Sequence, residues 1–247
     1  MARTVIEVND LVTRFGDRLV HDHISLHIEE GEIYGFLGPS GCGKSTLLRE
    51  IIFLEPIQSG SIRILESDVC GYGHDDVQEL RKRWGVLFQS NALFTSLTVA
   101  ENIALPLKEH TRFPAPLIDE IVAFKLDIVG LRQRDGFLYP SEISGGMQKK
   151  AALARALAFD PVLLFLDEPT SGLDPISARD FDALIVKLRD MMNLTIVMVT
   201  HDLASIENTL DRMAIIDERK IVAEGTLDEV KQADSPFVRT FFAGEAK

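Results

Sequence analysis

Hydrophobic residues follow two different patterns along this chain of 247 residues. They alternate with polar residues near the start, and they form short unbroken runs later on. The alternation, interrupted by turn residues at 58–60, predicts β-strands that build an antiparallel platform. These strands are expected at residues 5–8, 20–28, 33–37 and 61–65.

The pattern changes after Gln89. Apolar residues then recur every three or four positions, at 99–105 and 116–129, which predicts a helical insertion. From Met147 onward, helices alternate with fully apolar strands, an order typical of βαβ units in a parallel sheet. These strands are expected at 162–166, 195–199 and 213–216. We therefore predict an α/β fold in a single domain, with a core and β subdomain at about 1–88 and 147–247 and a helical subdomain at about 90–146.

The composition is that of an ordinary globular protein, with 46% hydrophobic and 26% charged residues. Because the formal net charge is −12, we expect no nucleic-acid partner and interpret the basic run 81–83 as a solvated helix face. Cys42 and Cys70 indicate no disulfide framework, which fits a reducing cytoplasm, and we interpret neither as a metal ligand. The N-terminus lacks a signal-peptide layout, and no apolar run approaches the roughly 18–20 residues of a membrane helix. Any membrane role is therefore expected to need a separate partner.

The segment 38–45 reads G-P-S-G-C-G-K-S and lies between an apolar strand and an apolar helix start. Its glycines allow backbone N–H groups to converge on phosphate oxygens, and the following helix adds the positive end of its dipole. Lys44 is expected to reach the β- and γ-phosphates, and Ser45 to ligate Mg²⁺. The alternative is a glycine-rich turn that only leads into a helix. The predicted phosphate-binding residues are Gly38, Pro39, Ser40, Gly41, Cys42, Gly43, Lys44, Ser45 and Thr46.

Two acidic residues follow the apolar run 162–166. They are expected at the carboxyl edge of a parallel sheet, where open α/β folds bind ligands. Asp167 is predicted to hold Mg²⁺ through water, and Glu168 to polarise the water that attacks the γ-phosphate. Alone, the pair could equally cap the next segment; beside a phosphate-binding loop, the catalytic interpretation is favoured.

A second glycine-rich helix start follows at 144–148, which reads S-G-G-M-Q and opens a helix expected to run to about Ala158. The first loop already surrounds the phosphates. Two such helix starts approaching one γ-phosphate from opposite sides would most simply belong to two subunits. The alternative is an N-cap serine followed by glycines that allow close packing.

Taken in order, these motifs resemble the nucleotide-binding subunit of an ATP-binding-cassette (ABC) transporter, and the resemblance covers nearly the whole chain. It implies a P-loop NTPase (RecA-like) core with ATP and Mg²⁺ as ligands. It also implies two ATP molecules held between two copies of the chain arranged head to tail. The residues that the resemblance adds are Phe15, stacked on adenine; Gln89, the Q-loop and an Mg²⁺ ligand; Ser144, Gly145, Gly146 and Met147, the signature that meets the partner's nucleotide; Ser171–Asp174, the D-loop; and His201, the switch histidine.

With these additions, the implied catalytic residues are Glu168, His201, Gln89 and Lys44, and the implied Mg²⁺ ligands are Ser45, Gln89 and Asp167. The signature departs from the common L-S-G-G-Q at Ile143 and Met147. Each added residue has a plainer interpretation when taken alone: Phe15 as core, Gln89 as a surface amide, and His201 as a neighbour of a helix N-cap.

Three segments, 88–111, 143–158 and 237–245, resemble more narrowly the Mla-type phospholipid transport ATPases, in which a Met after the paired glycines is typical. This resemblance implies phospholipid transport between inner and outer membranes from the cytoplasmic face of the inner membrane. The implied partners are membrane permease subunits, with an MCE-domain lipid-binding subunit and a small regulatory subunit as candidates. Apolar residues between 92 and 107 are expected partly to pack inward and partly to receive the permease. The alternatives are the ATPase of a small polar solute importer, such as an amino-acid importer, a soluble non-transport ABC ATPase, and a non-enzymatic binding module.

Overall fold

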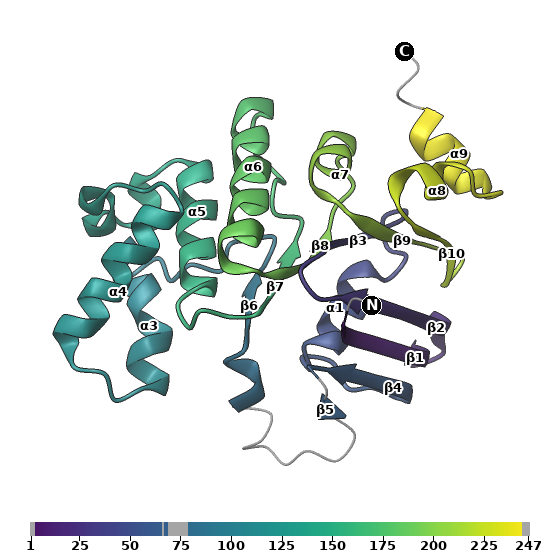
Figure 1. Ribbon diagram of the computed structural model, residues 1–247, viewed down its shortest axis with the longest axis horizontal. Helices are drawn as coiled ribbons and strands as arrows, with labels where there is room; N and C mark the ends of the chain where they lie inside the picture. The colour runs from purple at the N-terminus through teal and green to yellow at the C-terminus, as the bar shows by residue number, and fades with distance from the viewer. Residues whose placement is uncertain (1–2, 66, 69–78, 244–247) are drawn as a thin grey trace. The chain divides into compact units, whose positions relative to one another are not determined.

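The computed structural model describes residues 3–65, 67–68 and 79–243 (Figure 1). Their contacts divide the chain into two compact units. The first unit combines Met1–Glu79 with Thr195–Lys247, and the second is Leu80–Leu194. The domain and subdomain boundaries given above remain predictions.

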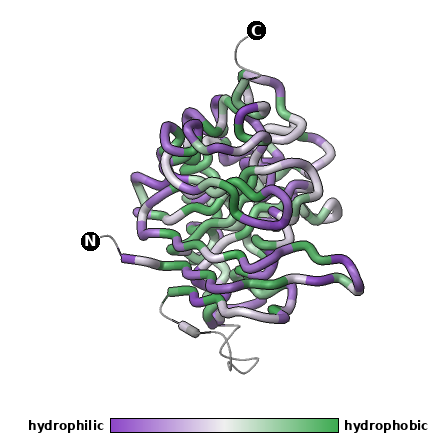
Figure 2. Tube along the Cα trace, turned by 90° about the vertical axis from the view of Figure 1, so that its right-hand side faces the viewer, coloured by the Kyte–Doolittle hydropathy of each residue, from purple (hydrophilic) through white to green (hydrophobic). Residues whose placement is uncertain are grey.

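The first unit contains the expected antiparallel sheet, in the order β2-β1-β4-β5. Its two long strands alternate between buried and exposed positions, and green and purple alternate near the N-terminus in Figure 2. Both are longer than predicted because bulges let the pairing continue past irregular positions. The strands are β1 (Thr4–Phe15), β2 (Arg18–Glu29), β4 (Ser59–Ile64) and β5 (Ser67–Asp68).

The same unit contains a second group of strands in the order β10-β9-β3-β8. β3 was expected in the antiparallel platform, and this was wrong: it pairs in parallel with β8 and β9. All five of its residues are buried, as in a strand covered on both faces. β10, which pairs antiparallel with β9, was not predicted. The strands are β3 (Ile33–Leu37), β8 (Thr195–Val199), β9 (Arg212–Asp217) and β10 (Lys220–Gly225).

The described residues of the first unit also form four helices for which bounds are given. They are α1 (Lys44–Ile51), α7 (Leu203–Thr209), α8 (Leu227–Lys231) and α9 (Pro236–Ala243). Near the C-terminus, Val230, Val238 and Phe242 pack with buried residues of β3 and β9 in one hydrophobic cluster. This cluster fixes the strand that leads into the phosphate-binding loop.

The second unit contains the parallel pair β6 (Trp84–Leu87) and β7 (Leu163–Asp167). Val162 was expected inside β7, but it precedes the strand and is 41% exposed. This unit also contains the helices α3 (Val99–His110), α4 (Ala115–Ile128), α5 (Gly145–Ala156) and α6 (Pro175–Met192), with short 3₁₀ turns η1 (Gln133–Phe137) and η2 (Pro140–Glu142). α3 begins at its predicted residue, where Thr98 and Glu101 form a capping box, and it continues past its predicted end to His110 with Pro106 inside it.

The α/β fold class, with parallel pairing and a separate antiparallel β subdomain, is confirmed. Cys70 lies outside the described residues. Within the described part of the chain, every helix is too short or too polar to cross a bilayer.

Candidate functional site

The loop between β3 and α1 has the backbone that phosphate binding requires. Gly38, Gly41 and Gly43 have φ angles of 143°, 79° and 110°, which L-residues with a side chain rarely adopt. A Cβ on Gly38 would lie 2.1 Å from the carbonyl oxygen of Ile216 on β9. The glycines at the two ends of the loop are therefore required by the fold of their own unit, as well as by any ligand.

Lys44 is the first residue of α1 and is 8% exposed. Its Nζ donates hydrogen bonds of 2.9 Å to the carbonyl oxygens of both Gly38 and Pro39, so the ammonium group lies over the loop. Burial raises the pKa of the neighbouring Cys42 thiol, although the charge of Lys44 opposes this. Cys42 is therefore held as a neutral thiol, and Lys44 is the charged group of the loop.

Two further predicted residues of the first unit lie at the ends of strands. Phe15 is the last residue of β1 and is 49% exposed, so it is not part of the core. Its ring is accessible for stacking on a flat ligand. His201 is exposed and follows β8, one residue before the N-cap of α7. This is the carboxyl end of a parallel strand, where α/β folds place ligand-contacting residues.

In the second unit, the two acids lie where β7 ends. Asp167 is its last residue and is 6% exposed, whereas Glu168 is half-buried and has a φ of 51°. A left-handed conformation at a residue with a long side chain costs free energy, of order 1–3 kcal/mol, and such residues cluster at functional sites. The two acids thus differ in burial and in backbone conformation, as is expected of residues with two different roles.

Gln89 follows β6, and its side chain is exposed. Its backbone carbonyl accepts a 2.8 Å hydrogen bond from Nζ of Lys149, which also lies 3.5 Å from the carbonyl oxygen of Glu168. Lys149 is on α5 and is 3% exposed. Burial lowers the pKa of this ammonium group, and the charges of Glu168 and Asp167 oppose the shift. Lys149 therefore links the Q-loop to the segment that bears the catalytic candidates.

Lys149 was missed by the sequence reasoning, as was Arg155 on the same helix. Arg155 donates hydrogen bonds of 2.6 and 2.9 Å to the carbonyl oxygens of Ala92 and Asn91, both of which have positive φ angles. The signal for Lys149 was its spacing of three and four residues from Ala152 and Leu153, which places it on the buried face of α5. A cation on that face needs partners, and here the partners are backbone carbonyls.

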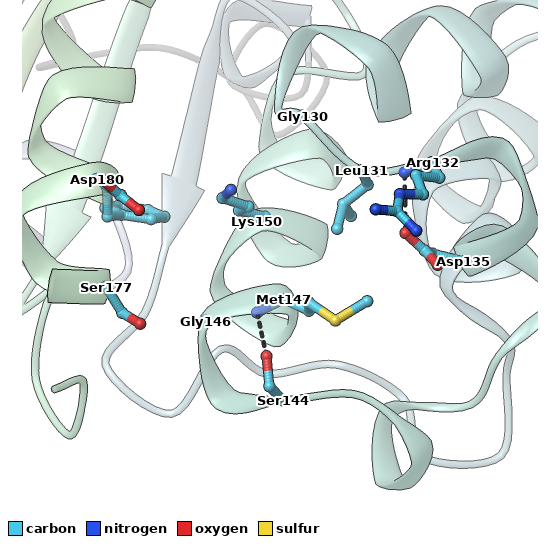
Figure 3. A pocket seen from close by; sticks show the side chains of 11 residues that line it. Gly130, Leu131, Arg132, Asp135, Ser144, Gly146, Met147, Lys150, Ser177 and Asp180 are labelled. Atoms are coloured by element: carbon cyan, nitrogen blue, oxygen red, sulfur yellow. Dashed lines mark hydrogen bonds between the residues drawn. The ribbon is translucent and has the colours of Figure 1, made fainter.

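The signature residues open α5 in a different way from the phosphate-binding loop, whose helix α1 has no side-chain cap. Ser144 is the N-cap of α5, and its Oγ accepts a 3.3 Å hydrogen bond from the backbone N–H of Met147 (Figure 3). A Cβ on Gly145 would lie 4.0 Å from Leu173, and one on Gly146 would lie 3.9 Å from Ser177. Both are ordinary contact distances, so the second unit itself has room for a side chain at either position.

A hollow of about 450 Å³ adjoins this helix start. Figure 3 shows Ser144 and Met147 at one side of it and Lys150, Ser177 and Asp180 around it. Asp174, in the D-loop, caps α6 by accepting hydrogen bonds from the N–H groups of Ile176 and Ser177. A bond from the Ser177 hydroxyl to Asp174 is the main reason why the pKa of Asp174 is lowered. The D-loop and the signature thus lie at neighbouring helix starts of one unit.

The three side chains that are predicted to bind Mg²⁺ all offer oxygen atoms. Mg²⁺ prefers hard oxygen ligands, which the hydroxyl of Ser45, the carboxylate of Asp167 and the amide of Gln89 provide. Ser45 belongs to the first unit and the other two to the second. Across the residues that the structure describes, no group of three His, Cys, Asp or Glu side chains could hold a metal ion by itself. Each unit therefore offers oxygen donors of the kind that Mg²⁺ binds together with phosphate oxygens.

Comparisons with known proteins agree with these features. The sequence profile described as "ABC transporter" matches residues 21–171. The chain is 42% identical over 246 residues to the "Intermembrane phospholipid transport system ATP-binding protein MlaF" of Haemophilus influenzae, covering 100% of this chain and 93% of that protein. It is 40% identical over 239 residues to the "Probable ribonucleotide transport ATP-binding protein mkl" of Mycobacterium bovis, covering 97% of this chain and 66% of that protein.

Among solved structures, the chain resembles the dimeric, post-hydrolysis state of the ATP-binding cassette MJ0796 bound to ADP and Pi. The TM-score is 0.81 at 28% sequence identity, covering 90% of this chain and 98% of that one. The family resemblance inferred from the motifs is confirmed, and with it the P-loop ATPase fold. The roles of the individual site residues remain predictions. The chain belongs to the ABC transporter family, of which it is an ATPase cassette.

Proposed function

We propose that this chain binds and hydrolyses ATP as one of two identical subunits, and that hydrolysis drives phospholipid transport between the inner and outer membranes. The main support for two subunits that act as a pair is the contrast between the two glycine-rich helix starts. The glycines of the phosphate-binding loop are required by their own unit. Gly145 and Gly146 are not, because a Cβ fits at both.

A glycine costs roughly 0.5–1 kcal/mol relative to alanine within a helix, so two in the first turn of α5 need a reason. Close approach of a ligand carried by another molecule supplies one. Ser144, Gly145 and Gly146 are exposed or half-buried, and their N–H groups lie at the positive end of the helix dipole. We therefore assign this helix start to the γ-phosphate of an ATP held by the second subunit.

The remaining roles follow from the chemistry of phosphoryl transfer. Lys44 and the loop N–H groups hold the β- and γ-phosphates, and Phe15 stacks on the adenine. Ser45, Gln89 and Asp167 hold Mg²⁺, which when bound neutralises charge on the phosphates. Glu168 orients the attacking water and takes its proton, and His201 contacts the γ-phosphate. These assignments place general-base catalysis on one side chain, and binding on the others.

The substrate and location rest on the relatives. Proteins named for intermembrane phospholipid transport match over nearly their whole length, at 40–42% identity. We infer that the chain works at the cytoplasmic face of the inner membrane, bound to permease subunits and an MCE-domain lipid-binding subunit. The mycobacterial relatives, named for ribonucleotide transport, favour a polar solute as the second candidate.

Assembly tests the paired arrangement. The Glu168→Gln variant of the full chain is mixed with ATP and Mg²⁺ or with ADP, and its mass is measured by light scattering after gel filtration. We expect a dimer with ATP and a monomer with ADP, because only ATP offers the γ-phosphate to the second helix start. A monomer under both conditions would contradict the proposal.

The substrate is tested on the complex purified from native membranes with the tagged chain. Mass spectrometry identifies the partners and any bound lipid, and phosphate release is then measured in nanodiscs with and without added phospholipid or ribonucleotide. Permease and MCE subunits with phospholipid-dependent hydrolysis would support lipid transport. Stimulation by ribonucleotide alone would favour the second candidate.

A further inference from the structure

A buried polar cluster in the first unit plays no part in the roles assigned so far. It joins Thr13 on β1, His21 on β2 and Glu50 on α1, which are 2%, 0% and 0% exposed. Nδ1 of His21 lies 2.7 Å from the hydroxyl of Thr13 and 3.2 Å from the carboxylate of Glu50. The hydroxyl of Thr13 lies 2.7 Å from the same carboxylate. Three side chains from three elements thus contact one another away from water.

The other nitrogen of His21 lies 3.2 Å from the carbonyl oxygen of Gly43 in the phosphate-binding loop. Because a carbonyl oxygen can only accept, Nε2 must carry a proton. In the arrangement that these contacts define, the hydroxyl of Thr13 donates to the carboxylate of Glu50, and Nδ1 of His21 lies beside both groups. Nε2–H is then directed at the carbonyl oxygen of Gly43.

Gly43 is the point at which this contact affects the loop. Its carbonyl oxygen also accepts the first hydrogen bond of α1, 2.8 Å from the backbone nitrogen of Leu47. Its φ of 110° is left-handed, and a Cβ there would lie 2.4 Å from Nε2 of His21. Glycine is the most flexible residue, so without this contact only the hydrogen bond from Leu47 would hold the Gly43 carbonyl. His21 both excludes a side chain at this position and holds the carbonyl.

We propose that Thr13, His21 and Glu50 form a positioning triad that fixes the Gly43 peptide, and thereby presets the loop N–H groups for the phosphates of the nucleotide. This inference rests on the proposed binding of ATP by the loop. Thr13 and Glu50 orient the imidazole ring, and His21 transmits that orientation through Nε2–H. None of the three touches the reacting atoms, so the triad determines nucleotide affinity and leaves the hydrolysis step to Glu168.

The test compares His21→Leu with His21→Gln in the full chain. Leu removes the donor, whereas the amide nitrogen of Gln can replace Nε2–H. Affinity for a non-hydrolysable ATP analogue is measured by calorimetry, and KM and kcat are measured by phosphate release.

We expect His21→Leu to weaken binding and to raise KM by roughly tenfold, because the loss of one hydrogen bond of about 1.4 kcal/mol corresponds to that factor. The kcat should stay within about twofold of wild type. His21→Gln is expected to stay within roughly threefold of wild type in affinity. The control is His27→Leu, which removes an exposed imidazole from the same strand.

Wild-type affinity in a folded His21→Leu variant would overturn the triad, as would an equal loss in the Leu and Gln variants. A variant that lost kcat but kept KM would also overturn it. If His21→Leu fails to fold, Thr13→Val decides: weakened binding supports the triad, and wild-type binding refutes it. A wild-type chain that bound no nucleotide at all would instead refute the proposed function, so the two failures are distinguishable.

Discussion

The helix starts at α1 and α5 are both rich in glycine, but they differ in how the helix is capped and in whether their glycines have room for a side chain. At α1, no side chain caps the helix; left-handed glycines form the loop, and a neighbouring strand holds the carbonyl of Gly43. At α5, Ser144 caps the helix with its own hydroxyl, and its glycines have room for a Cβ. The first loop is preorganised by its own fold, whereas the second is an ordinary helix start left open. A glycine that its own chain does not require indicates a molecule that approaches from outside.

The largest effect is expected from Glu168→Gln, which separates the hydrolysis step from the binding of phosphate by the two helix starts. Glu168→Gln leaves both helix starts intact and removes only the group that takes a proton from water. Loss of a general base typically costs 10²–10⁴-fold, so we expect phosphate release at saturating ATP to fall by about that factor. Binding of the ATP analogue should be unchanged. Undiminished turnover would remove Glu168 from its assigned role, and Glu120→Gln, at an exposed glutamate on α4 of the same unit, is the matched control.

Alanine at the two glycines tests the comparison directly. Gly43→Ala places a Cβ against Nε2 of His21 in a left-handed conformation, which we expect to cost about 1–3 kcal/mol of unfolding free energy together with nucleotide affinity. Gly145→Ala should leave stability equal or raise it by up to about 1 kcal/mol, because alanine is the better helix former.

These variants are compared by chemical denaturation and by ATP-dependent dimerisation. The expected pattern is loss of the fold's stability at Gly43 and loss of dimerisation alone at Gly145. If Gly145→Ala dimerised and hydrolysed ATP normally, the open helix start would have no role toward a partner. Equal destabilisation by both substitutions would remove the distinction between the two helix starts.

How much the sequence predicted also differs between these regions. The loop 38–45 was placed correctly between a strand and a helix, because its glycine spacing and flanking apolar runs are local signals. The pairing of β3 was misassigned, because a short apolar run has no alternation that would separate a platform strand from a strand buried on both faces. β10 was missed, since only half-buried residues mark it.

The supporting residues were harder still. Lys149 and Glu50 are ionisable residues on the buried face of a helix, which is a signal that the sequence shows, but the partners of both side chains come from distant segments. Lys149 contacts the carbonyl of Gln89, sixty residues earlier in the chain, and Glu50 contacts Thr13, thirty-seven residues earlier. No periodicity within a helix reports such contacts. The motif residues could therefore be named from sequence, whereas the side chains that hold them required the structure.

A smaller effect is expected at Lys149, which supports the site of the second unit as His21 supports that of the first. Lys149→Met removes the tether between the Q-loop carbonyl and the Glu168 segment while keeping a side chain of similar length. Relief of the desolvation that lowers the pKa of Lys149 offsets part of the lost hydrogen bonding, so we expect a cost of only about 1 kcal/mol in stability. Turnover should fall by roughly tenfold, because Gln89 and Glu168 lose their shared support.

Denaturation and phosphate release measure the two effects, with Lys187→Met, at an exposed lysine of α6, as the matched control. Turnover equal to that of wild type would show that the Q-loop needs no tether from α5. The contrast between α1 and α5 would then concern only the first turn of each helix, and not the residues that support the site from further along the helix.

The smallest effect concerns pH and the cap of α6. Hydrogen bonds from the Ser177 side chain and from backbone N–H groups lower the pKa of Asp174 in the folded state. A carboxyl group whose pKa is lower in the folded state than in the unfolded state stabilises the fold fully when the pH is above the unfolded value, near 3.9. This contribution is lost as the pH falls through the folded value.

We expect Asp174→Asn to be slightly less stable than wild type at pH 7, since the amide oxygen still accepts hydrogen bonds from the helix N–H groups but carries no charge. In thermal unfolding from pH 7 to 2.5, the midpoints of Asp174→Asn and wild type should converge. Asp119→Asn, which removes an exposed carboxylate from α4, is the control. A difference that stayed constant to the lowest pH would show that the charge of Asp174 does not stabilise the cap, and that α6 begins, like α1, without help from a charged side chain.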